Sequence, residues 1–81
     1  MNPRIIDVTT TDEYILELVF DNGERGSYNC SGLLDFGIFK QLKDLSYFHR
    51  ARTLDGTVVW PNGQDICPDT LYLDSTKQHA A

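Results

Sequence analysis

Hydrophobic and polar residues alternate along the first part of the chain, as they do in strands with one buried face. This pattern predicts a first strand over residues 4–10, in which Ile6 and Val8 share a face. It predicts a second strand over residues 14–20, with every second side chain apolar and directed inward. The two strands would begin an antiparallel sheet.

The turn after the second strand is a hairpin loop whose length is decided by side-chain parity. A two-residue loop would pair Phe20 with Arg25 and mix apolar and charged side chains on one face. A three-residue loop over residues 21–23 keeps the apolar side chains together. We therefore expect the longer loop, with Gly23 in the left-handed region and a third strand over residues 24–30.

Residues 31–48 lose the alternation and change to helical spacing. Ile38, Leu42 and Leu45 recur at intervals of four and three residues, with polar residues between them. Because two glycines interrupt this run, we expect short helical turns rather than one long helix. Asp44 is placed to cap the last of these turns.

The dipeptide Asp55-Gly56 is typical of a two-residue type I′ turn and predicts a second hairpin. Its strands would cover residues 50–54 and 57–60, and Trp60 would point inward at the end. Large aromatic side chains also anchor interfaces, but an inward tryptophan at a strand end fills a small core. We prefer the core position for Trp60.

The C-terminal part predicts one more short helix. Pro68 suits its first position, which leaves Cys67 at the N-cap and Asp69 near the positive end of the helix. Residues 71–73 would close over the sheet. Residues 75–81 are small and polar, and we expect a frayed tail there.

Together these elements predict one small α+β domain over residues 1–81, with its ordered core at about residues 3–73. An antiparallel sheet of about five strands would be covered on one face by short helices. No run approaches the roughly 18 apolar residues of a membrane span. The opening residues also lack the pattern of a signal peptide, so we expect a cytoplasmic protein without membrane contact.

The charge balance limits the choice of partner. The chain has 7 Lys and Arg residues against 12 Asp and Glu residues, with a formal net charge of -5. Proteins that bind nucleic acids neutralise phosphates with Lys and Arg, so we expect no direct nucleic-acid binding by this chain alone. A basic protein surface is the more natural partner.

Neither cysteine has the surroundings that a nucleophile needs. A helix N-terminus would lower the pKa of the Cys67 thiol, but Asp65 and Asp69 would oppose that effect. We interpret Cys67 as a cap or a small buried residue, and Cys30 as part of the core. The sequence therefore predicts no catalytic residue and no cofactor.

Asn62, Asp65 and Asp69 carry the hard oxygen ligands that Ca²⁺ or Mg²⁺ prefers. Their spacing does not match the calcium-binding loop, which needs oxygens at alternating positions and a terminal Glu. We prefer local hydrogen bonding, with Asp65 at a turn and Asp69 at a helix start. A small-ligand or metal-sensing regulatory domain that uses Asp65, Asp69 and Asn62 is the alternative function.

The run from Thr57 to Tyr72, TVVWPNGQDICPDTLY, resembles the C-terminal signature of a bacterial family catalogued as domain of unknown function 2442. The opening fits as well, with Pro3-Arg4 before the first strand and LVFDNGE at residues 18–24. The resemblance covers most of residues 3–73. The positions that match the signature are Trp60, Pro61, Asn62, Gly63, Asp65, Pro68, Asp69 and Tyr72.

The resemblance implies a small prokaryotic protein, often encoded beside a second small protein in a pair suspected to be toxin–antitoxin-like. It brings no catalytic residue. We expect a non-enzymatic protein-interaction module, the accessory or antitoxin-like half of such a pair, with a small basic protein as partner. Self-association into a homo-oligomer is left open. The candidate binding surface consists of Trp60, Asn62, Gly63, Asp65, Asp69 and Tyr72, which could equally form only a folding motif.

Overall fold

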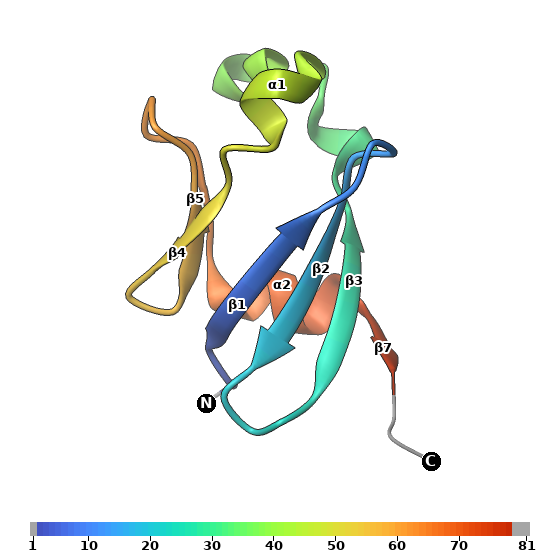
Figure 1. Cartoon of the computed structure of the whole chain (residues 1–81), viewed down its shortest axis with the longest axis vertical. Helices are drawn as coiled ribbons and strands as arrows, with labels where there is room; N and C mark the ends of the chain where they lie inside the picture. The colour runs from blue at the N-terminus through green and yellow to red at the C-terminus, as the bar shows by residue number, and fades with distance from the viewer. Residues whose placement is uncertain (1, 79–81) are drawn as a thin grey trace.

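A computed structural model of the chain describes residues 2–78 and shows an α+β fold (Figure 1). One sheet has four strands in the order β1-β2-β3-β7, and the other has three in the order β4-β5-β6. All neighbouring strands are antiparallel. The expected α+β class and antiparallel pairing are confirmed. The strands are divided over two sheets, however, rather than forming one sheet of about five.

The strands of the larger sheet are β1 (Ile5–Thr10), β2 (Ile15–Phe20), β3 (Arg25–Asn29) and β7 (Thr76–Gln78). Those of the smaller sheet are β4 (Arg52–Leu54), β5 (Thr57–Val59) and β6 (Asp65–Ile66). The helices are the 3₁₀ helices η1 (Cys30–Leu33) and η2 (Gly37–Lys43) and the α-helices α1 (Leu45–Phe48) and α2 (Pro68–Asp74). None of these helices is long and apolar enough to cross a membrane.

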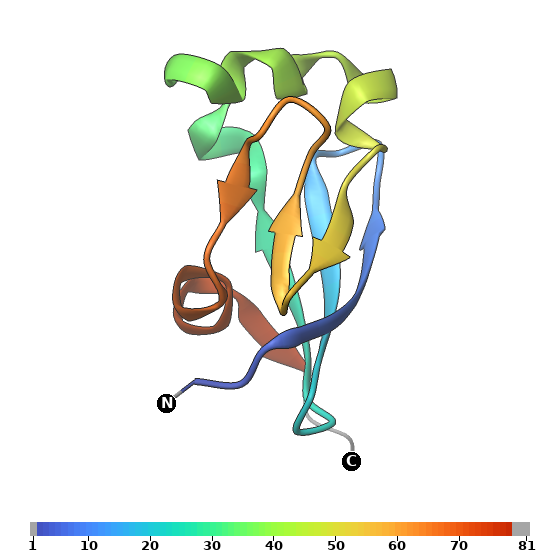
Figure 2. The same ribbon diagram turned by 90° about the vertical axis from the view of Figure 1, so that its left-hand side faces the viewer.

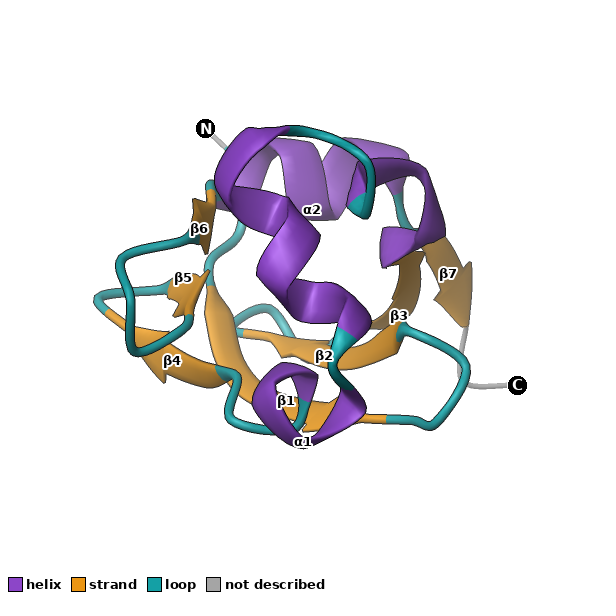
Figure 3. Cartoon of the chain, turned by 90° about the horizontal axis from the view of Figure 1, so that it is seen from above, coloured by secondary structure: helices purple, strands orange, loops and turns teal. Residues whose placement is uncertain are grey.

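The core lies between the two sheets and the helices. In Figure 1, α2 crosses behind β1, β2 and β3, while η1, η2 and α1 lie across one end of the molecule. Figure 2 shows the smaller sheet standing beside the larger one, and Figure 3 shows α2 on the inner side of the larger sheet, whereas α1 overlaps β1 in that view. The buried hydrophobic residues are Ile5, Leu16, Leu18, Phe20, Tyr28, Cys30, Leu42, Tyr47, Phe48, Val58, Trp60, Ile66 and Leu71.

The hairpin between β2 and β3 has the expected three-residue loop. Leu18 lies opposite Gly26, so the apolar face stays intact. The amide of Gly23 donates to the Phe20 carbonyl over 3.0 Å, and Gly23 has a φ of 88°. A glycine suits this left-handed position because other residues meet a steric cost there. The parity argument is confirmed.

The hairpin between β4 and β5 is also as expected. Asp55 and Gly56 both have positive φ, 52° and 81°, as a type I′ turn requires. Leu54 lies opposite Thr57. The Arg4 guanidinium donates to the Asp55 carbonyl over 2.8 Å, which connects this turn to the start of β1.

The expected face of β1 is wrong at its first residues. Ile5 lies opposite Phe20, but the register then shifts so that Asp7 lies opposite Val19. The shift is a β-bulge, which adds one residue to a strand and reverses the parity before it. Ile5 is therefore buried, and Ile6 is 59% exposed.

The expected helical stripe over residues 38–45 is only partly present. Leu42 is buried, but Ile38 is exposed. This segment is a 3₁₀ helix with three residues per turn, so residues four apart no longer share a face. The Asp44 carboxylate accepts a hydrogen bond from the Ser46 amide over 3.0 Å at the start of α1, which confirms the expected cap.

Helix α2 begins at Pro68 with Cys67 at its N-cap, as expected. Leu71 is buried, but Leu73 is exposed, so residues 71–73 do not all close over the sheet. The reason is geometric, because residues two apart on an α-helix point in different directions.

The expected frayed tail is wrong for residues 76–78, which form β7 along β3. Thr76 lies opposite Ser27. The Lys77 ammonium donates to the carbonyls of Tyr72 and Ser75 and lies 4.2 Å from the centre of the Tyr72 ring. The hydrophobic and polar pattern of residues 76–78 did not indicate a strand, because a short edge strand is held by backbone pairing rather than by buried side chains. Residues 79–81 lie outside the described part.

Candidate functional site

The signature run forms a third tight hairpin, which joins β5 to β6. The Trp60 amide donates to the Gln64 carbonyl over 2.9 Å, and the Gly63 amide donates to the Trp60 carbonyl over 3.1 Å. Gly63 has a φ of 96°. Both hydrogen bonds and the left-handed glycine repeat the geometry of the loop between β2 and β3. Residues 61–63 therefore form a three-residue hairpin loop.

Trp60 is buried, which confirms its core position. Its indole Nε1 donates to the Phe48 carbonyl over 3.0 Å, and its ring lies 6.1 Å from the Phe48 ring. The Phe48 carbonyl, at the end of α1, also accepts from the Ala51 amide over 3.2 Å, so the indole is its second donor. Trp60 thus connects the smaller sheet to the helical end of the molecule.

A buried polar network lies beside this hairpin, and the sequence analysis did not find it. Gln64 is only 1% exposed, and its amide donates to the Ile38 carbonyl over 2.9 Å. The Tyr47 hydroxyl donates to Gln64 Oε1 over 2.6 Å and accepts from the Asn62 amide over 2.9 Å. The alternation of Gln64, Asp65 and Ile66 was the available signal, because Gln64 and Ile66 share the inward face.

The three candidate metal ligands have separate surroundings. The Asn62 side chain donates to Gln41 over 2.8 Å. The Asp69 carboxylate accepts from Asn2 over 3.2 Å, and Asp65 is exposed on β6 opposite Val59. Within residues 2–78, no group of three or more His, Cys, Asp or Glu residues could hold a metal ion.

Tyr72 holds α2 against the larger sheet. Its hydroxyl donates to Glu24 Oε1 over 2.6 Å, and this hydrogen bond raises the pKa of Tyr72. Its ring meets the Phe20 ring edge-on at 5.0 Å. Tyr72 therefore contacts the β2–β3 hairpin.

The two thiols have opposite environments. Cys30 is buried, and burial raises the pKa of its thiol to about 12. Cys67 is exposed, and its Sγ lies 3.2 Å from the Thr70 hydroxyl. The hydrogen bond from Thr70 lowers the pKa of the Cys67 thiol. Cys30 is a core residue, as expected, and Cys67 occupies the cap position.

The sequence pattern also did not indicate a chain of hydrogen bonds between the end of α1 and the β1–β2 turn. The Thr10 hydroxyl lies 2.6 Å from His49 Nδ1, and His49 Nε2 lies 2.8 Å from Asp12 Oδ1. A carboxylate only accepts, so a neutral His49 carries its proton on Nε2 and accepts from Thr10. Because the Asp12 side chain is 84% exposed, water weakens this pair. The contact fastens α1 to the β1–β2 turn.

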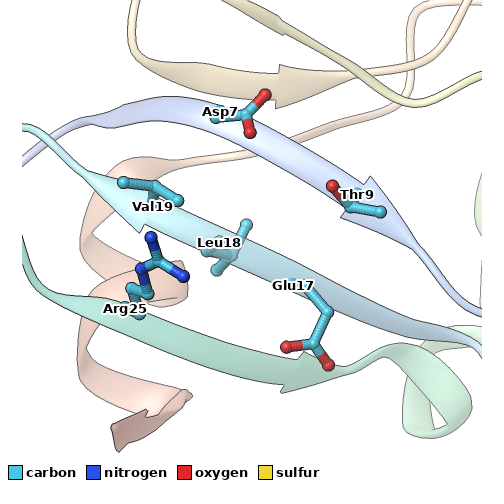
Figure 4. Close-up of a pocket in the computed structure, with 6 residues that line it drawn as sticks. All are labelled: Asp7, Thr9, Glu17, Leu18, Val19 and Arg25. Carbon is cyan, nitrogen blue, oxygen red and sulfur yellow. The ribbon is translucent and has the colours of Figure 1, made fainter. Parts of the chain in front are cut away.

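The larger sheet has an outer face, which points away from α2 and the core. Three strands contribute polar side chains to a shallow hollow of about 220 Å³ on this face, which we call the outer hollow (Figure 4). Its lining residues are Asp7, Thr9, Glu17, Leu18, Val19 and Arg25.

Strand pairing orders these side chains in two rows. Asp7, Val19 and Arg25 lie opposite one another across β1, β2 and β3. Thr9 lies opposite Glu17 in the next row. Figure 4 shows Asp7 and Glu17 on opposite sides of the hollow and Arg25 beside Val19. The outer hollow therefore combines acidic, basic and apolar groups on an uncovered sheet face.

Residues 5–77 match the family described as "Protein of unknown function (DUF2442)". The chain belongs to the DUF2442 family. No curated protein and no solved structure matches it. The family description assigns no activity, so the function has to be argued from the geometry of this DUF2442 protein.

In this DUF2442 chain, much of the signature serves the fold. Trp60 fills the core, Gly63 provides the left-handed turn and Pro68 starts α2. The candidate surface does not gather at one place, because Asn62 and Asp69 contact Gln41 and Asn2 respectively. The outer hollow lies outside the signature run.

Proposed function

We propose that this DUF2442 protein is a non-enzymatic interaction module of the bacterial cytoplasm, and that it binds a small basic protein. In this proposal it is the accessory or antitoxin-like half of a two-gene pair. The observation that carries the proposal is the display of negative charge. Except for Glu17 and Glu24, which are partly buried, every Asp and Glu side chain is exposed.

The exposed negative charge supports binding of a basic protein surface more than it supports a catalytic role for these carboxylates. Exposed carboxylates steer an oppositely charged partner towards the protein and raise its association rate. A catalytic carboxylate, in contrast, is usually partly buried so that its pKa is shifted towards its task. A working monomer and a homo-oligomer are both compatible with this role.

The test is co-expression with the product of the neighbouring gene, with an affinity tag on one protein. We expect a complex whose dissociation constant rises with salt, because exposed charges are screened within about 10 Å at 0.1 M ionic strength. Light scattering on the isolated chain and on the complex gives the oligomeric state. A failure to associate at micromolar concentration, or an affinity that ignores salt, contradicts the proposal.

A further inference from the structure

The outer face of the larger sheet is not covered by a helix anywhere in residues 2–78 (Figures 1 and 3). We infer that this face is a docking surface for a basic segment of a partner protein, in which an arginine stands beside an aliphatic side chain. The inference rests on the proposed function, and it adds where the partner binds and what chemistry it presents.

The β-bulge in β1 determines which side chains this face exposes. It places Ile6 and Asp7, two consecutive residues, both in exposed positions. Bulges commonly redirect a side chain next to functional sites. Ile6 is 59% exposed, and Val19 lies half-buried opposite Asp7. The face thus offers aliphatic surface beside a carboxylate, as interfaces with an apolar centre and a polar rim do.

Opposite charges on this face lack partners within the protein. Among residues 2–78, no hydrogen bond or ion pair engages the side chain of Asp7 or Arg25. Glu17 accepts a hydrogen bond from the Ser27 hydroxyl over 3.0 Å, which fixes the direction of its carboxylate. The charges of Asp7 and Arg25 are therefore available to pair with charged groups of a partner protein.

Arginine suits this face better than lysine does. Asp7 and Glu17 are diagonal neighbours on adjacent strands, and the Cα atoms of such neighbours lie roughly 7–8 Å apart. A guanidinium has five donors in a planar fork, so it can pair with the Asp7 carboxylate and donate to a second acceptor as well, whereas a lysine ammonium is a compact point charge. The Thr9 hydroxyl, opposite Glu17, provides a further acceptor. Arg25 repels a cation and so confines it to the Asp7 side.

A protein segment fits this place better than a small molecule does. The outer hollow measures about 220 Å³ and is polar, whereas small-molecule sites are typically enclosed, mostly apolar and roughly 300–1,000 Å³ in volume. An open sheet face with a rim of charges instead matches a partner surface of complementary charge. The net charge of -5 favours a basic partner over an acidic one.

The experiment uses the full chain and a short capped peptide of alternating arginine and valine, followed by NMR amide shifts. Two peptides of the same length, with glutamate or with lysine in place of arginine, are the comparisons. We expect the arginine peptide at millimolar concentration to shift the amides of Asp7, Thr9, Glu17 and Val19. The lysine peptide should bind more weakly, and the glutamate peptide should leave these amides unchanged.

Matched variants assign the effect to this face. The double change Asp7→Asn/Glu17→Gln should weaken binding of the arginine peptide about three- to tenfold, because it removes two carboxylates whose exposed ion pairs are individually weak. Glu13→Gln/Asp74→Asn removes the same charge at exposed positions elsewhere and should leave affinity unchanged. Arg25→Gln should tighten binding, because it removes a repelling charge.

Two results overturn the inference. One is a set of shifts centred on another region, such as the exposed residues Phe36 and Ile38, with β1 and β2 unaffected. The other is a purified basic partner that binds the Asp7→Asn/Glu17→Gln variant as tightly as the native chain. That second result rejects this face but leaves the interaction role intact, whereas the absence of any partner rejects the proposed function itself.

Discussion

The indole of Trp60 donates a hydrogen bond to the carbonyl of Phe48 over 3.0 Å, and the two rings lie 6.1 Å apart at 30°. Twelve residues separate them along the chain. This contact joins the β5–β6 hairpin to α1, and it shows why a tryptophan, with one donor and a large apolar ring, suits this position. Trp60 is therefore a structural residue, and its loss should lower the stability of the whole domain.

Replacing Trp60 by phenylalanine should destabilise the protein by about 2–4 kcal/mol, because it leaves a cavity in the core and removes the buried hydrogen bond from the indole to the Phe48 carbonyl. Urea unfolding followed by far-UV circular dichroism measures the change, since the variant has no tryptophan to follow. Phe36→Leu is the control, because Phe36 is exposed and its variant should stay within about 0.5 kcal/mol. Equal stability of the two variants contradicts a core role for Trp60.

Replacing Tyr47 by phenylalanine tests the buried network around Gln64. The variant leaves Gln64 Oε1 and the Asn62 amide without the hydroxyl that both contact, which costs about 1–3 kcal/mol. In a domain of this size, each 1 kcal/mol lowers Tm by roughly 4–8 °C.

The control for the network is Tyr72→Phe. The Tyr72 hydroxyl also makes a short hydrogen bond, to Glu24, but at a partly buried position that water can reach. Its loss should lower Tm less than the Tyr47 variant does. If Tyr72→Phe is the more damaging change, the buried network is not an important source of stability.

Side-chain parity was sufficient for the fold wherever a strand has one buried face. It predicted the pairing of Leu18 with Gly26 and the position of Gly23, because a slip of one residue would expose the whole apolar face. It failed at Ile6, because a bulge changes parity without any sequence signal of its own. It also missed β7, where backbone pairing and Lys77 take the place of buried apolar residues.

The candidate site was less predictable, for a related reason. Asn62 and Asp69 are near in sequence, but their side chains contact Gln41 and Asn2, which only the tertiary fold brings to them. The Thr10–His49 contact joins residues 39 positions apart, so no local pattern could indicate it. Cys30 and Trp60 were predictable as core, because both follow the inward parity of a strand end.

Replacing Gly63 by alanine tests the tight turn of the signature. Gly63 has a φ of 96°, and a side chain in the left-handed region costs roughly 1–2 kcal/mol. No atom lies within 4 Å of the added methyl, so the loss reports backbone strain rather than a clash. Gly32→Ala has equally open surroundings and no positive φ, and it should be neutral in the same urea titration. Similar losses at both positions contradict the assignment of strain to the turn.

The two cysteines should react with alkylating reagents at very different rates. The thiolate is the reactive form, so a lowered pKa lets a thiol react at lower pH, and a raised pKa prevents reaction. Cys67 is exposed with a lowered pKa, whereas burial raises the pKa of Cys30 to about 12. At pH 8, mass spectrometry of the folded protein with iodoacetamide should therefore show one rapid adduct, on Cys67.

The cause of the lowered pKa can be tested at Thr70. In the thiolate form, the Thr70 hydroxyl donates to Cys67 Sγ, and this hydrogen bond favours the charged state. Thr70→Val removes the donor at nearly constant volume, so the pH at which the alkylation rate is half-maximal should rise towards the ordinary thiol value of about 8.5. Cys30 should become reactive only when urea unfolds the chain. A pH profile that does not move with Thr70→Val would show that other groups near the start of α2 set the reactivity of Cys67.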